Sequence, residues 1–163
     1  MSFSNILIVK LSAIGDVIHA LPVAGALKQC FPQARITWVV EKPAYDLLTN
    51  NPYINEIIIF DKPRFKTLQG LRQNAPDFIQ NLRNRRFDLA LDLQGLFKSA
   101  AIGFLSGAPQ RYVYCNAREY SHLLARKVCG PHAKGHIVEQ YLDVVRELGA
   151  QVTAAEWAIR PTA

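Results

Sequence analysis

Short apolar runs recur along the chain and predict the strands of a parallel sheet. Val, Ile and Leu fill these runs without strict alternation, and polar residues, Gly or Pro bound them. Continuous apolar runs of this length are typical of parallel strands that are covered on both faces. The predicted strands are 6–9 (ILIV), 36–40 (ITWVV), 56–60 (EIIIF), 89–93 (LALDL) and 111–115 (RYVYC).

Segments with a helical spacing of apolar residues lie between the predicted strands. Residues 17–31 show this spacing, and we expect Pro22 to lie near the first turn of that helix or to kink it. The other predicted helices are 43–50, which starts at Pro43, 64–86, which holds one or two helices divided near Pro76, and 137–148, which Gly149 caps.

The alternation of strands and helices predicts an α/β fold, a Rossmann-like three-layer domain with a mainly parallel sheet. With 163 residues the chain is long enough to bury the core of one such domain. Ligands of these sheets bind beyond the carboxyl ends of the strands. The segments to inspect are therefore 10–16, 41–42, 61–66, 94–99 and 116–119, which are strongly polar and basic.

The charge balance favours an anionic partner. Lys and Arg total 19 against 13 acidic residues, which gives a formal charge of +6 and leaves RNA, a membrane surface and phosphorylated sugars or lipids open. The basic residues lie in separate loops without interleaved aromatic residues, so we expect no nucleic acid. No apolar run is long enough to cross a membrane, and we expect no secretion signal in MSFSNILIVK.

The three cysteines, odd in number and without a CxxC pair, suit a reducing cytoplasm better than a disulfide framework. Cys129, His132 and His136 have a loosely metal-like spacing. Three ligands across a Gly-Pro loop make a weak zinc site, so we expect no metal there.

The stretch KLSAIGDVIHALP follows the first predicted strand and contains a single glycine, Gly15, followed by Asp16. Asp16 has two interpretations, as the N-cap of the helix or as a base that takes a proton from a substrate hydroxyl. Its two oxygens can serve both roles. His19, on the same helix face, is expected to orient Asp16, touch substrate or pack against another helix. Gly15 permits a tight turn or the close approach of a ligand.

Three stretches in this order resemble the family 9 glycosyltransferases, the heptosyltransferases of lipopolysaccharide core assembly. They are ILIVKLSAIGDVIHALP, ITWVVE and DLQGLFKSA, and the resemblance runs from about residue 5 to residue 149. It implies the N-terminal half of a two-domain glycosyltransferase fold, with residues 1–150 as the acceptor-binding domain. Residues 151–163 would then begin a linker to a donor-binding domain that the chain lacks, and the isolated chain would transfer no sugar.

The resemblance also implies residue roles. Asp16 matches the catalytic base of an inverting transfer, with Ser12, Gly15, His19 and Gln94 as supporting residues. The acceptor-binding residues implied are Lys62, Arg64, Lys66, Lys98, Ser99 and Arg118, of which Lys98 and Ser99 fall in the loop after the fourth strand.

The substrates implied are ADP-heptose, the donor, held by the other domain, and Kdo-lipid A, the acceptor; no cofactor is expected in this domain. The implied location is the cytoplasm of a Gram-negative bacterium, at the inner face of the inner membrane, with its anionic leaflet as a partner. Two alternatives stay open, a non-catalytic module that binds acidic glycolipid and a flavodoxin-like domain that binds a small nucleotide. The stretch LSAIGD is a poor phosphate loop for the second.

Overall fold

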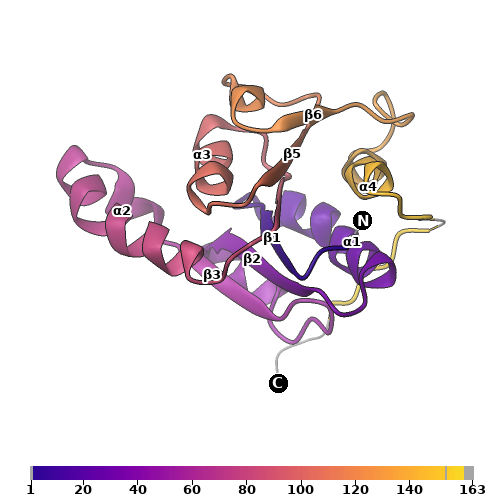
Figure 1. Cartoon of the computed structure of the whole chain (residues 1–163), viewed down its shortest axis with the longest axis horizontal. Coiled ribbons are helices and arrows are strands. Elements are labelled where there is room, and N and C mark those ends of the chain that lie inside the picture. The colour runs from indigo at the N-terminus through magenta and orange to yellow at the C-terminus, as the bar shows by residue number, and fades with distance from the viewer. Residues whose placement is uncertain (1, 153, 160–163) are drawn as a thin grey trace.

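A computed structural model describes residues 2–152 and 154–159. In this part of the chain six strands form one sheet in the order β3-β2-β1-β4-β5-β6, and each pair of neighbours is parallel (Figure 1). This is the strand order of Rossmann folds. Successive strands are added on one side of β1 up to β3 and on the other side from β4 onward, so the order reverses between β1 and β4. The strands are β1 (Asn5–Val9), β2 (Arg35–Glu41), β3 (Glu56–Phe60), β4 (Leu89–Asp92), β5 (Gln110–Tyr114) and β6 (Arg126–Val128).

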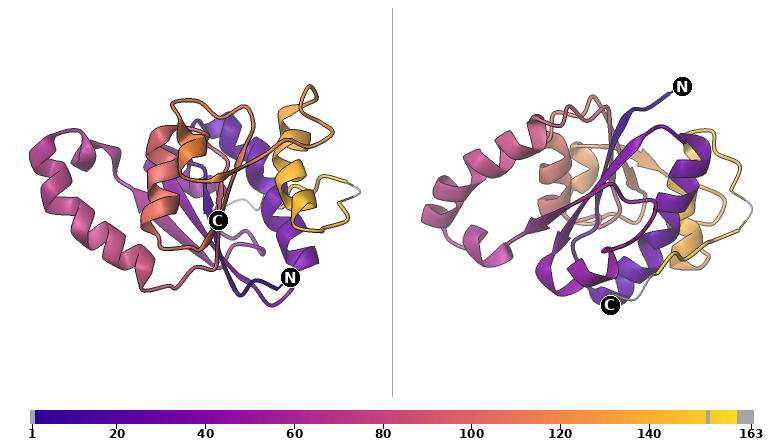
Figure 2. Two further views of the ribbon diagram at one scale, coloured as in Figure 1. Left: turned by 45° about the horizontal axis from the view of Figure 1, so that its top comes forward. Right: turned by 90° about the horizontal axis from the view of Figure 1, so that it is seen from below.

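Helices cover both faces of the sheet and make three layers. The α-helices are α1 (Ile14–Cys30), α2 (Leu68–Arg83), α3 (Phe97–Leu105) and α4 (Ile137–Glu147), and short 3-10 turns form η1 (Lys42–Leu47), η2 (Lys62–Phe65) and η3 (Ser121–Leu123). Helices α1 and α4 pack side by side on one face, and α2 and α3 lie on the other (Figures 1 and 2). The predicted three-layer, parallel α/β fold is confirmed.

Strand β1 shows why the apolar runs do not alternate. Ile6 and Ile8 belong to the core under α1 and α4, whereas Leu7 and Val9 belong to the core under α2 and α3. All four are fully buried. Successive side chains of a strand point to opposite faces, so a strand between two helical layers must be apolar at every position.

The boundaries of several elements differ from the predicted ones. Helix α1 begins at Ile14, so Pro22 lies about two turns inside it rather than in its first turn. Helix α2 is one helix that runs through Pro76, and the segment after Pro43 is the 3-10 turn η1 instead of an α-helix. Strand β6 and helix α3 had no predicted counterpart. Gly149, with φ +92°, ends α4 as expected.

The last described residues lie against the domain. The Trp157 indole N–H donates to the carbonyl oxygen of Ile18 at 3.1 Å, and the Asn51 amide donates to that of Ala158, also at 3.1 Å. The predicted linker, 151–163, is thus described only in part, because residues 153 and 160–163 lie outside the described residues. Within residues 2–152 and 154–159, no helix is both long and apolar enough to cross a membrane.

Candidate functional site

The loops after β1 and β4 meet at the point where the strand order reverses. The side-chain oxygen of Gln94, Oε1, accepts hydrogen bonds from the backbone N–H of Leu11 at 3.1 Å and of Ser12 at 3.3 Å. Gln94 therefore holds the β1–α1 turn against the end of β4. Of the predicted supporting residues, the structure brings Gln94, Ser12 and Gly15 together with Asp16 at this crevice.

Asp16 is exposed on the first turn of α1. It is the third helical residue and not the N-cap, because Ala13 occupies the cap position. Its Oδ2 accepts the backbone N–H of Ala13 at 3.3 Å, and no hydrogen bond to Oδ1 is found among the described residues. One oxygen thus serves the helix end, where the helix dipole favours a negative charge, and the other is available to a ligand.

Two buried charged residues to which the sequence analysis gave no role lie beneath this turn. Lys10 and Asp92 are only 3% and 4% exposed. Asp92 Oδ1 accepts the backbone N–H groups of Gln94 and Gly95, each at 3.0 Å, whereas its Oδ2 is buried without a partner among the described residues. Burial raises the pKa of Asp92 to about 6, against the pull of those hydrogen bonds and of the Lys10 charge.

Lys10 connects this buried pair to α4. Its ammonium lies 5.4 Å from the ring centroid of Tyr141. Burial lowers the pKa of Lys10, and the charges of Asp16 and Asp92 oppose that shift. Burial and the same two carboxylates raise the pKa of Tyr141. A signal for Asp92 was present in the sequence, because an ionisable residue interrupts the apolar run LALDL.

A hollow of about 470 Å³ opens between the β1–α1 turn and the β2–η1 turn. Glu41 is the one charged residue that lines it, and Gly15 lies at its edge. A methyl group built on Gly15 would meet no atom within 4 Å, and the φ of Gly15 is not positive. Gly15 therefore does not serve a tight turn. Its missing side chain leaves room beside Asp16.

Lys98 and Ser99 lie in the first turn of α3 and not in a loop. The Lys98 ammonium pairs with Glu41 Oε1 at 3.1 Å and lies 5.5 Å from the ring centroid of Phe60. Ser99 is fully buried, and its hydroxyl accepts the Leu96 N–H at 3.1 Å and donates to the Leu96 carbonyl at 2.8 Å. Ser99 thus supports the helix end and presents no surface to an acceptor.

The remaining basic candidates flank the crevice at the same sheet edge. Lys62, Arg64 and Lys66 follow β3, Arg118 follows β5, and all four are exposed. Arg64 pairs with Asp61 at 3.1 Å. Four strand spacings separate β3 from β5, about 19 Å at 4.8 Å each. The predicted basic rim is therefore divided. Lys62, Arg64 and Lys66 lie on one side of the β1–α1 turn, and Arg118 lies on the other.

His19 packs between helices. Its ring lies edge-to-face on that of His136, with centroids 5.5 Å apart, and its Nδ1 is buried without a partner among the described residues. No hydrogen bond joins His19 to Asp16 in that part of the chain. Of the three expectations for His19, helix packing fits this geometry.

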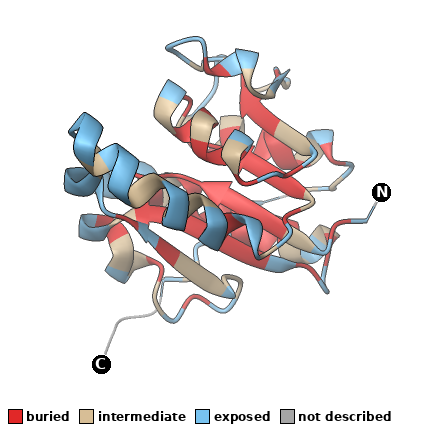
Figure 3. Cartoon of the chain, turned by 60° about the vertical axis from the view of Figure 1, so that its left-hand side comes forward, coloured by how far each residue is buried: buried red, intermediate tan, exposed pale blue. Residues whose placement is uncertain are grey.

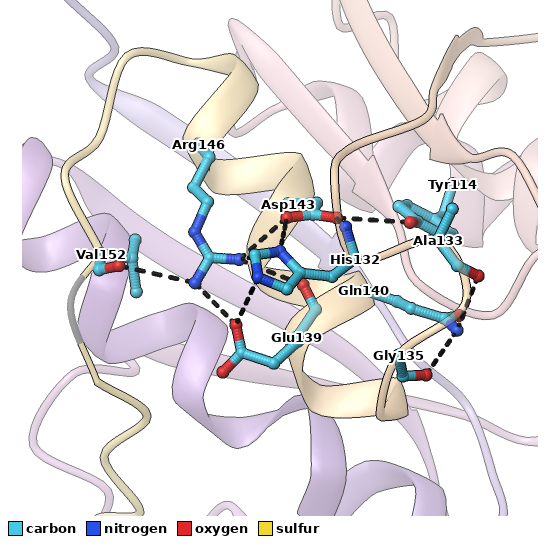
Figure 4. A network of polar contacts seen from close by, with 9 residues as sticks. All are labelled: Tyr114, His132, Ala133, Gly135, Glu139, Gln140, Asp143, Arg146 and Val152. Carbon is cyan, nitrogen blue, oxygen red and sulfur yellow. Dashed lines mark hydrogen bonds and ion pairs between the residues drawn. The ribbon is translucent and has the colours of Figure 1, made fainter.

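His132 belongs to an ion-pair network on α4 (Figure 4). Its Nδ1 lies 2.7 Å from Asp143 Oδ1, and Arg146 bridges Asp143 at 2.8 Å and Glu139 at 2.7 Å. Burial alone would raise the pKa of Asp143, but the hydrogen bonds from His132 and Arg146 hold it below its usual value. Among the described residues no three His, Cys, Asp or Glu side chains gather where they could hold a metal ion.

Known proteins resemble this chain in sequence. The sequence profile of glycosyltransferase family 9 (heptosyltransferase) matches residues 76–159. The lipopolysaccharide core heptosyltransferase OpsX of Haemophilus influenzae is 25% identical over 157 residues, which cover 95% of this chain and 43% of that protein. Lipopolysaccharide heptosyltransferase 1 of Pseudomonas aeruginosa is 35% identical over 99 residues, 59% of this chain and 28% of that protein.

Solved structures agree with the fold. The Escherichia coli heptosyltransferase WaaC with ADP superposes with a TM-score of 0.81 at 25% identity, over 94% of this chain and 51% of that one. A family 9 glycosyltransferase from Veillonella parvula gives 0.80 at 21% identity, over 98% of this chain and 46% of that one.

The fold and crevice define a Rossmann-like α/β domain. The chain belongs to glycosyltransferase family 9, the heptosyltransferases. It spans about half the length of the solved relatives and somewhat less of OpsX.

Proposed function

We propose that this chain is the acceptor-binding side of a heptosyltransferase of lipopolysaccharide core synthesis. The donor is ADP-heptose and the acceptor is Kdo-lipid A, presented at the cytoplasmic face of a Gram-negative inner membrane with anionic lipids. Residues 1–150 form the acceptor domain, and 151–163 lead toward a donor-binding half. The observation that carries the proposal is the Asp16 carboxylate, exposed at the point where the strand order reverses and without a glycine-rich phosphate loop.

The reaction assigned to the crevice is an inverting displacement. An acceptor hydroxyl oxygen attacks the anomeric carbon of the heptose while Asp16 takes the hydroxyl proton. The bond from that carbon to the ADP oxygen breaks, and ADP leaves from the opposite face with the bonding electron pair. A carboxylate can act as a base here because the proton becomes acidic only as the new bond forms. No cofactor enters this scheme, since ADP-heptose is a substrate.

The buried pair beneath the turn supports this role for Asp16. The Asp16 carboxylate lies close enough to the buried Lys10 for its charge to oppose the lowering of the Lys10 pKa. The carboxylates of the acceptor sugars are assigned to Lys98 and to the flanking groups Lys62, Arg64, Lys66 and Arg118. Exposed charge pairs are screened by salt, so acceptor affinity should fall steeply as salt is added.

Calorimetric titration of the chain tests the proposal. A soluble Kdo-containing acceptor should bind at low salt, and ADP-heptose should bind weakly because its pocket belongs to the other half. ADP-heptose binding tighter than about ten micromolar would reverse the assignment of the two halves. Acceptor binding without transfer, once the chain is joined to an active donor-binding half, would leave a non-catalytic glycolipid-binding module. A bound flavin would instead favour the flavodoxin-like alternative.

A further inference from the structure

An apolar groove of about 370 Å³ runs between α2 and α3 on the face of the sheet opposite to α1 and α4. Apart from Lys98, every residue that lines it is apolar. The lining includes Phe65, Leu71, Ala75 and Phe97 at or near the carboxyl edge of the sheet. Helix α2 exposes most of its length to solvent (Figure 3), and Leu71 and Phe97 remain 44% and 52% exposed.

The groove is long and its two ends differ. It follows α2 from Leu71 to Leu82, which is about 16 Å at 1.5 Å per residue. At the amino edge the Arg83 side chain donates to the carbonyl oxygen of Leu105 at 2.9 Å and ties α2 to the end of α3. At the carboxyl edge Lys98 lines the groove, and the exposed Lys62 and Lys66 follow β3.

We propose that this groove binds one acyl chain of the acceptor glycolipid, with an anionic group of the same molecule at the basic mouth. The inference rests on the proposed function, because it takes the acceptor to be an acidic lipid. An apolar channel with cationic groups at one end complements an amphiphile with an anionic head. Lys98 also pairs with Glu41, which lines the hollow beside Asp16, so the mouth and the crevice adjoin.

Dodecyl phosphate, below its micelle concentration, probes the groove without any sugar. Each methylene buried adds roughly a factor of four to affinity, so hexyl phosphate should bind the chain at least about 100-fold more weakly. A dodecyl maltoside probe, with a neutral head, should bind about tenfold more weakly than dodecyl phosphate. Equal binding of the long and short phosphates would overturn the proposal. Equal binding of the charged and neutral probes would remove the anionic mouth from it.

Variants that fill the groove locate the binding. Ala75→Phe, on α2, and Ala101→Phe, on α3, should each weaken dodecyl phosphate binding at least tenfold. Filling an apolar hollow should at the same time keep or raise the melting temperature. The matched control is Ala133→Phe, at an exposed alanine before α4, which should leave binding unchanged. Unchanged binding in both groove variants, with intact melting curves, would overturn the proposal, as would a loss in the control.

A second copy of the chain is the main competing occupant. Sedimentation would then show a dimer that Ala75→Phe dissociates, and wild-type chain would not bind dodecyl phosphate. Failure here is distinguishable from failure of the proposed function, because heptose transfer to a soluble, deacylated acceptor does not need the groove. Transfer with no amphiphile binding would reject only the groove assignment.

Discussion

The turns that start α1 and α3 contain the same capping hydrogen bond but differ in whether a ligand can reach them. Each helix has an apolar cap residue, Ala13 or Leu96, and in each the third helical side chain reaches back to the cap backbone N–H. In α1 that side chain is the exposed carboxylate of Asp16, whereas in α3 it is the hydroxyl of Ser99, which is fully buried. The same geometry therefore leaves one turn open to a ligand and closes the other.

The comparison separates a chemical role from a supporting one. Asp16 can bond a ligand without breaking its bond to Ala13, because only one carboxylate oxygen is used. Ser99 uses its hydroxyl as both donor and acceptor on Leu96 and is fully buried, so it offers no surface to a ligand. Substitutions of Asp16 should therefore change activity, and those of Ser99 should change stability.

The largest effect is expected for Asp16→Asn. In a protein that joins this chain to a donor-binding half, turnover should fall roughly 100-fold or more, because the amide cannot take the hydroxyl proton. Acceptor affinity should change little. Steady-state kinetics with Asp77→Asn, an exposed carboxylate on α2, as control measures this. Near-normal turnover in Asp16→Asn would mean that Asp16 is not the base and serves only to cap the start of α1.

Asp92→Asn should change how stability depends on pH. Because the folded pKa of Asp92, about 6, lies above its usual 3.8, the folded state binds more protons between these values and wild-type stability falls as pH rises through them. The variant should gain roughly 2–3 kcal/mol on wild type between pH 4 and pH 7. Asp143 has a lowered pKa, so its contribution to stability changes with pH in the opposite direction. This contribution is the same in the variant and in wild type, so it cancels in the difference between them.

Denaturant unfolding at each pH gives this difference. A constant gap between Asp92→Asn and wild type across the range would mean that Asp92 is ionised as easily as an exposed carboxylate.

Ser99→Ala should destabilise the chain by about 1–2 kcal/mol, because the partly buried N–H and carbonyl of Leu96 lose their side-chain partner. Asp16→Asn should cost less than about 0.5 kcal/mol, since the amide oxygen can still accept from Ala13 and the site is exposed. Urea unfolding of both variants compares the turns directly. A larger loss in Asp16→Asn than in Ser99→Ala would contradict the assignment of open and closed turns.

The two glycines of these turns give the smallest effects. Gly95, with φ +71°, would bring an added methyl group within 3.2 Å of the Ala117 Cα, so Gly95→Ala should destabilise by about 1 kcal/mol or more. Gly15→Ala should be neutral or stabilising by up to about 1 kcal/mol, because it adds a good helix former in open space. Thermal melts measure both. Lower acceptor affinity in Gly15→Ala would show that a ligand occupies that space.

The sequence predicted the strands well because β1 to β5 are apolar on both faces. Strand β6 was not predicted because no apolar run marks it. Arg126 and Lys127 are exposed on the sheet edge, and only Val128 of this strand is buried. Helix α2 passes through Pro76, which a local propensity argument treats as a helix start. Pro76 itself is exposed to solvent on this helix.

The site was partly predictable for a related reason. Asp16 and the basic residues stand in loops directly after strands, where topology alone places them at one edge. Whether a residue there is exposed depends on contacts with distant segments. Lys10 is buried and lies under Tyr141 of α4, more than 100 residues away. No local pattern reports such a contact, so the burial of Lys10 could not be read from the sequence. Ser99 lies at the start of α3, a helix that was not predicted.

The bond from Gln94 to the β1–α1 turn also bears on how the protein is made. Its partners, Leu11 and Gln94, are 83 residues apart, and β1 pairs with β4 across a similar separation. Contacts between distant segments form slowly because the intervening chain must first be closed into a loop. During synthesis at about 5–20 residues per second, residues near Asp16 leave the ribosome several seconds before Gln94 does. The crevice is therefore expected to take shape only after β4 and Gln94 have left the ribosome.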